Sequence, residues 1–193
     1  MRDAMVNYSR TAMSRQAQRE DGSLLPRGGN DVIGTAPGGL FPCAPGGLDD
    51  WAYIFTSRGN EEHWKRLCKA IGREDLLDDP RMKDGGTRYE NKELVDKAIS
   101  DWTSKHTKRE VMETIASAKV PCGAVLNMQE QLNDKDLHQR GIMTKINHPV
   151  RGEMTVPASP IFMSNSKIDV TTAPLHGGHN EEIYGDWLGY SSE

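Results

Sequence analysis

Apolar residues recur at helical spacing in the first third of this chain. In residues 1–20, Ala4, Met5 and Tyr8 fall on one face, which predicts a helix. Asn60 is a good N-cap and Gly72 a good stop, so a second helix is predicted between them. The apolar stripe of that second helix consists of Trp64, Leu67, Cys68 and Ile71.

The same spacing predicts four further helices. After Thr87, an amphipathic helix is formed by Leu94, Val95, Ala98, Ile99 and Trp102. Thr107 and Glu110 make a capping box, because each side chain can satisfy an amide that the helix leaves unpaired. Asn127 and Glu130 open a short helix. A terminal helix spans 180–188, with the anchors Ile183, Tyr184, Trp187 and Leu188.

Strands are predicted in the remaining apolar segments. Residues 40–43 and 51–55 each read as a strand, and residues 120–125 read as a short buried strand. Residues 143–146 and 153–156 pair around a turn at 149–152. Glycine and proline alternate through residues 21–50, which excludes a helix there. Such long loops are usually functional or disordered.

The composition narrows the class of protein. Only 36% of the 193 residues are hydrophobic, so we expect part of the chain to lean on another domain or subunit. The net charge of −4, with bases interleaved among acids, argues against nucleic-acid binding. No apolar run approaches the ~20 residues of a membrane span, and the N-terminus has no signal core. We therefore expect a soluble, cytoplasmic protein.

The cysteines and histidines offer little chemistry. Cys43, Cys68 and Cys122 are odd in number and far apart, which predicts reduced thiols. Nothing basic adjoins Cys122, so we expect it to pack in the core. His176 and His179 lack a third ligand at a convincing spacing. We expect a turn there and no metal site.

The glycine-rich segment is the best candidate for function. Gly34, Gly38 and Gly39 let the backbone come close to an anion or a thioester. The segment lacks the Lys-Ser/Thr of a P-loop, so nucleoside triphosphate binding is not expected. A mobile active-site loop and an ordinary surface loop both remain open. The acidic residues Asp49, Asp50, Glu61 and Glu62 read as turn and helix-start positions and are weak catalytic candidates.

Several phrases together resemble the family III CoA-transferases. Trp64–Cys68 with Ile71–Arg73 and Asp79–Arg81 is similar to the family's "W–LC–xxLG–DPR" run. Further matches, in the family's order, are Arg27–Asn30, Arg88 and Asn91, Val120–Val125, His148–Pro149, Ser159–Pro160, Pro174–Leu175, Gly177 and His179. The resemblance covers nearly the whole chain.

The resemblance implies an α+β small domain flanked by segments of an α/β Rossmann-like large domain. Residues 1–26 would be a helix and linker from the large domain, 27–140 the small domain, and 141–193 a return segment. Residues 1–4 look like the end of the family's "V-x-V-x-M-x-D-A" segment, so we expect the N-terminal half of the large domain to be missing. The family's catalytic aspartate would lie upstream, which leaves no catalytic residue in this chain.

The resemblance also implies CoA transfer between carboxylic acids through anhydride and thioester intermediates. Coenzyme A would be a substrate and no cofactor would be needed. The partners would be an acyl-CoA, a carboxylic acid, and either a second copy in an interlocked dimer or a separate large-domain chain. The substrate-binding loop would run from Asp31 to Gly39. Val32, Ile33, Thr35 and Ala36 depart from the glycine run of formyl-CoA transferases, which weakens any claim of formyl- or oxalyl-CoA specificity.

Two alternatives remain open at this point. α-Methylacyl-CoA racemases share the fold and carry a glutamate where this chain has Asn60. Because asparagine cannot act as a general base, transfer is favoured over racemisation. The other alternative is a noncatalytic association subunit or truncated product, and the low apolar content agrees with it.

Overall fold

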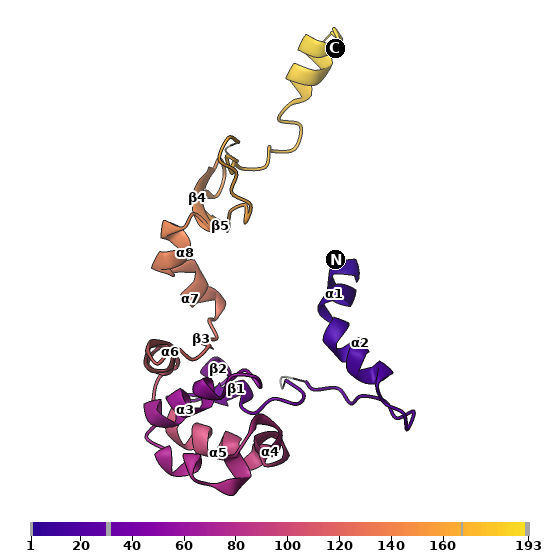
Figure 1. Cartoon of the computed structure of the whole chain (residues 1–193). Helices are drawn as coiled ribbons and strands as arrows, with labels where there is room; N and C mark the ends of the chain where they lie inside the picture. The colour runs from indigo at the N-terminus through magenta and orange to yellow at the C-terminus, as the bar shows by residue number, and fades with distance from the viewer. Residues whose placement is uncertain (1, 30–31, 167, 192–193) are drawn as a thin grey trace. The chain divides into compact units, whose positions relative to one another are not determined.

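The structure is a computed structural model that describes residues 2–29, 32–166 and 168–191. The chain divides into two compact units, unit 1 (Met1–Val125) and unit 2 (Leu126–Glu193) (Figure 1). Each is a mixture of helices and strands, which agrees with the predicted α+β class. The predicted boundaries at 26 and 140 stay predictions.

A three-stranded antiparallel sheet forms the centre of unit 1. Its strands β1 (Gly38–Pro42), β2 (Trp51–Phe55) and β3 (Cys122–Ala124) lie in the order β1-β2-β3. In β2 the side chains alternate, since Ala52 and Ile54 are fully buried while Tyr53 is exposed. One face of the sheet therefore faces the core.

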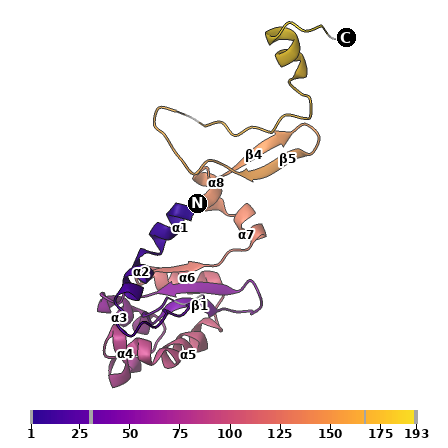
Figure 2. The same cartoon turned by 90° about the vertical axis from the view of Figure 1, so that its right-hand side faces the viewer.

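Helices pack on that face. The long ones are α3 (Glu61–Ala70), α5 (Lys92–Thr103) and α6 (Lys108–Ser117), and Figure 2 shows α4 (Gly85–Glu90) and α5 on one side of the strands. Two short 3-10 helices, η1 (Glu74–Leu77) and η2 (Pro80–Met82), join α3 to α4. The core runs from Ala36 to Val120 and has Trp64, Leu67, Ile99, Val111 and Ile115 among its members.

Local sequence signals set most helix boundaries as predicted. The Asn60 side chain accepts a hydrogen bond from the Glu62 amide, and Gly72 follows α3 at φ +68. The capping boxes of Thr107 with Glu110 and of Asn127 with Glu130 are both formed. The amphipathic helix expected after Thr87 is found as α5. The short helix α4 before it was not predicted, and the Asp84 carboxylate caps it by accepting from the amides of residues 86 and 87.

Two expectations for unit 1 need correction. In the segment 120–125 Val120 is buried as expected, but the strand itself, β3, is half-buried, because among the described strands it pairs only with β2 and forms an edge of the sheet. The helix expected over residues 1–20 is found as α1 (Arg2–Tyr8) and α2 (Arg10–Ala17). Between them the Ser9 hydroxyl donates to the carbonyl of Met5, 3.0 Å away, a local bond of the kind that bends helices.

Unit 2 is built from short elements. Helix α7 (Met128–Leu132) and the hairpin of β4 (Met143–His148) and β5 (Gly152–Pro157) are formed as predicted. Helix α8 (Lys135–Gln139), which lies between them in the chain, was not predicted. A π-helix, η3 (Glu181–Trp187), follows near the end of the chain. Every residue of unit 2 that the structure describes is at least partly exposed. The predicted anchors of the terminal helix are therefore uncovered in this chain, and Trp187 is 70% exposed.

Within the described ranges, no helix is both long and apolar enough to cross a bilayer.

Candidate functional site

The glycine-rich segment forms a tight turn ahead of β1. The amide of Val32 donates to the carbonyl of Gly38 at 2.9 Å, and the Thr35 amide donates to the Val32 carbonyl at 3.1 Å. Gly34 sits inside this turn at φ +79, a left-handed conformation that glycine adopts without strain. A side chain on Gly34 would begin 3.4 Å from Nη1 of Arg15, which itself donates to the Ile33 carbonyl at 2.5 Å.

Gly38 and Gly39 belong to the sheet and not to the turn. They pair with Phe55 and Ile54 of β2, and both glycines are buried. The expectation of one loop running through Gly39 is therefore wrong for its last two residues. Asp31, where the predicted loop begins, lies outside the described residues.

The segment between the turn and the strand rests on the core. Thr35, Ala36 and Pro37 are buried, and Ala36 is a member of the core cluster. The carbonyl of Pro37 accepts hydrogen bonds from Thr56, from its amide at 3.1 Å and its hydroxyl at 3.3 Å. Residues 35–37 therefore contribute to the folded core of unit 1. The Val32–Gly34 part of the turn is the section left for contact with a ligand.

Two of the acidic residues noted in the sequence, Glu61 and Glu62, are held by structural partners. Both carboxylate oxygens of Glu61 accept from the guanidinium of Arg88, at 2.8 and 2.9 Å. Glu62 pairs with Lys65 at 2.8 Å, and this hydrogen bond is the main cause of the lowered pKa of Glu62. Neither carboxylate is presented as a free general base, which agrees with the helix-start interpretation.

The structural role of Arg88 was not recognised from the sequence. Its side chain is only 1% exposed and also donates to the carbonyl of Met82 at 3.0 Å. The guanidinium carbon lies 5.1 Å from the ring centre of Trp64, which is within cation–π range. Helical spacing gave no signal, because the residues three and four positions away are polar or glycine; the available signal was the family phrase that Arg88 shares with Asn91.

The three thiols are poor nucleophiles in this environment. Burial raises the pKa of Cys68 to about 12 and that of Cys122 to about 11, and it raises the pKa of Cys43 as well. Cys43 and Cys68 are buried, while Cys122 is half-buried against the core. The core-packing interpretation of Cys122 therefore agrees with its surroundings, although it lies at the core's margin.

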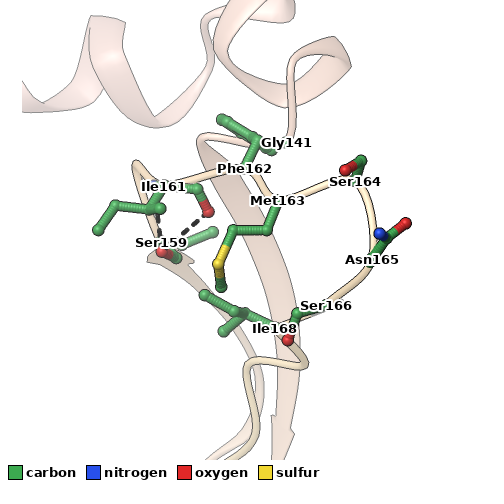
Figure 3. A pocket seen from close by; sticks show the side chains of 10 residues that line it. Gly141, Ser159, Ile161, Phe162, Met163, Ser164, Asn165, Ser166 and Ile168 are labelled. Atoms are coloured by element: carbon green, nitrogen blue, oxygen red, sulfur yellow. Dashed lines mark hydrogen bonds between the residues drawn. The ribbon is translucent and has the colours of Figure 1, made fainter.

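The exposed histidines and a hollow in unit 2 are the remaining candidates for a site. Among the described residues, no cluster of three or more His, Cys, Asp or Glu could hold a metal ion. His176 and His179 are both exposed. In unit 2 an open hollow of about 630 Å³ is lined by Ile161, Phe162 and Met163 together with Ile168 (Figure 3). The Ser159 hydroxyl there donates to the Ile161 carbonyl at 3.3 Å and accepts from the Ile161 amide at 3.2 Å.

The chain belongs to CoA-transferase family III. The family's sequence pattern matches residues 1–180, which confirms the resemblance seen in the sequence.

Particular relatives agree with this assignment. A formyl-CoA:oxalate CoA-transferase of Streptomyces avermitilis is 33% identical over all of this chain and 49% of its own length. An enzyme of the same name from Bradyrhizobium sp. is 31% identical over 99% of this chain and 48% of its own length. The chain thus spans about half the length of the curated relatives it matches.

Solved structures support the fold. A CAIB/BAIF family protein from Brucella suis superimposes with a TM-score of 0.70, at 20% identity, over 91% of this chain and 43% of its own. A hypothetical protein from Mycobacterium tuberculosis gives a TM-score of 0.62 at 18% identity, over 93% of this chain and 44% of its own.

Proposed function

We propose that this chain is one part of a CoA-transferase that moves CoA between two carboxylic acids. The observation that carries the proposal is the family match over residues 1–180, reinforced by relatives that align with the whole chain. Those relatives are named as enzymes that act on formyl-CoA and oxalate. A small acyl-CoA and a small carboxylic acid are the corresponding substrate classes.

The covalent chemistry would take place on an aspartate outside residues 1–193. Its carboxylate attacks the acyl-CoA carbonyl, which forms a mixed anhydride and releases CoA thiolate. The thiolate then attacks the aspartyl carbonyl, which gives an enzyme thioester and frees the first acid. The acceptor carboxylate repeats both steps in reverse, and the aspartate is regenerated. Covalent catalysis splits one difficult acyl transfer into easier steps. No redox or organic cofactor is required.

Within this scheme the glycine turn would cover the thioester. Gly34 lies in the turn with a left-handed backbone that glycine adopts without strain. Gly38 and Gly39 follow the turn as the first two residues of β1. The turn's backbone could then approach a bound acyl group and shield it from water. The hydrogen bonds of Val32 and Thr35 keep the turn compact and residues 35–37 are buried, so we expect its movement to be confined to residues 32–34.

We further propose that the working enzyme contains the rest of the large domain, either in an interlocked dimer of longer chains or on a separate large-domain chain, and acts in the cytoplasm. Unit 2 supports this assembly, because its large apolar side chains are exposed in the isolated chain. They include Phe162, Tyr184, Trp187 and Leu188. The buried core lies entirely within residues 36–120 of the described chain.

The test compares this chain alone with the chain fused behind the N-terminal half of the Streptomyces avermitilis relative. Both are assayed with formyl-CoA and oxalate, and then with other short acyl donors and acceptors, by chromatography of the CoA esters. We expect no transfer by the chain alone and measurable transfer by the fusion. Turnover by the isolated chain would contradict the partial-enzyme proposal.

A folded fusion needs its own control. In this control the catalytic aspartate of the relative's N-terminal half is replaced by asparagine. The substituted fusion should lose CoA transfer without a change in its circular dichroism spectrum. A fusion that is folded and binds CoA, yet transfers it between no pair of acids, would contradict the transferase proposal.

A further inference from the structure

A hollow of about 500 Å³ lies where two helices of unit 1 end. Its cationic side chains are Arg66 and Lys69 from the last turns of α3 and Lys119 just beyond α6. The remaining wall is formed by Ala70, Ser117 and Ala118. All three cations are exposed, so they reach the hollow from solvent-facing positions.

These cations have no side-chain partner within the described part of the chain. The neighbouring Lys65 is paired with Glu62, whose lowered pKa also reflects the charges of Arg66 and Lys69 after that of Lys65. A helix C-terminus carries roughly half a negative charge, so two ends offset about one of the three positive charges. About two positive charges therefore remain unbalanced around the hollow.

Lys119 occupies an unusual backbone conformation. It has φ 60, and no other non-glycine residue in the described ranges has a positive φ. The end of α3 repeats the same pattern with a glycine: Arg73 N donates to Cys68 O at 2.8 Å after Gly72, as Val120 N donates to Ile115 O at 3.2 Å after Lys119. Glycine is the usual residue at this position. A lysine at this positive φ strains the backbone, and its side chain adds a third positive charge to the hollow.

We propose that this hollow binds the phosphate group of a small molecule. A phosphate dianion matches the two unbalanced positive charges, and arginine and lysine are the side chains that bind phosphate best. A nucleic acid would need basic residues along a track, whereas the chain's net charge is −4 and these cations are confined to one hollow. The site is independent of the proposed transfer reaction.

The direct test is a titration of the ¹⁵N-labelled full chain, followed by NMR. One arm uses inorganic phosphate and the other adenosine 3′,5′-bisphosphate. We expect saturable shifts at the amides of Ala70, Ala118 and Lys119, and a weaker affinity when NaCl is raised from about 20 to about 200 mM. Tighter binding of the bisphosphate would indicate a nucleotide-type ligand, and equal binding would indicate phosphate itself.

Lys119→Gly separates binding from folding. It removes one charge and places glycine where the backbone favours it, so affinity should fall about threefold while the Tm rises by a few degrees. Lys69→Gln should give a similar loss, and the double variant a larger one. Lys105→Gln removes an exposed lysine outside the hollow and should leave the affinity unchanged.

Several results would overturn the site. One is the absence of saturable shifts at the hollow with both probes. Another is a Lys119→Gly variant that is more stable and binds phosphate as tightly as the unaltered chain. Equal losses in Lys105→Gln and Lys69→Gln would show only a general charge effect, which would also overturn it.

Discussion

Arg88 and Glu61 form a two-pronged ion pair between helices α4 and α3, although they are 27 residues apart in the chain. The arginine is 1% exposed, whereas the glutamate side chain is 43% exposed and reaches water. The pair joins the start of α3 to a helix that the chain reaches only after two 3-10 turns. It positions both helices against the core beside Trp64.

Breaking this pair should destabilise unit 1 through the buried arginine. Glu61→Gln leaves that charge without its carboxylate, so we expect a loss of about 2 kcal/mol in the free energy of unfolding, below the ~3–5 of a fully buried pair. Urea unfolding followed by tryptophan fluorescence measures the loss. Glu62→Gln, which breaks an exposed pair, is the matched control and should cost less than about 0.5 kcal/mol. Equal effects of the two substitutions would contradict the role of Arg88.

The glycine turn should tolerate side chains unequally. At Gly34 alanine would have to adopt φ +79, and we expect a loss of about 1 kcal/mol in unfolding free energy. At Gly38 a Cβ would lie 3.3 Å from the Val32 Cβ and the Thr35 Cγ2, so we expect a comparable loss from crowding. Gly59→Ala is the control, because its added carbon would have no neighbour within 4 Å.

These glycine variants also test the proposed cover over the thioester. In the active fusion, Gly34→Ala should lower CoA transfer or increase acyl-CoA hydrolysis more than Gly59→Ala does. Counting CoA transferred and CoA hydrolysed in one assay separates the two effects. Unchanged values for both reactions in a folded Gly34→Ala fusion would contradict a covering role.

The acid stability of unit 1 should depend on the cap of α4. Hydrogen bonds from the amide and then the hydroxyl of Thr87 lower the pKa of Asp84 below its usual 3.8. Because the folded-state pKa is the lower one, this contribution is present above pH 3.8 and is lost as the pH falls through the folded value. Asp84→Asn keeps an acceptor for the cap but cannot titrate. Urea midpoints between pH 7 and about pH 2 should therefore fall less steeply for Asp84→Asn.

Thiol modification should report the order of burial. Cys68, with a pKa of about 12, should react with a disulfide reagent only when unit 1 unfolds, while the half-buried Cys122, at about 11, reacts first. Mass spectrometry of peptides after timed labelling measures the order. Fast labelling of Cys68 in the absence of denaturant would contradict it.

Sequence patterns were most reliable where one short segment settles its own structure. The caps formed by Asn60, by Thr107 with Glu110 and by Asn127 with Glu130 depend on bonds that reach no further than three residues. The hairpin of β4 and β5 is likewise a local pairing around one turn. The glycine turn could be located in the same way, since Gly34 signals a left-handed backbone.

Other features were decided only by the tertiary structure, because they depend on residues that are distant in the chain. Gly38 and Gly39 became strand because β2 supplies their hydrogen bonds across the sheet, which a run of glycines and prolines does not indicate. β3 became a half-buried edge because no fourth strand pairs with it in the described chain. Arg88 is buried because Glu61 and the Met82 carbonyl meet its guanidinium, and the cations of α3 meet Lys119 because two helices end side by side. Residue spacing records short-range geometry, whereas these arrangements arise from packing between segments that meet only in the folded chain.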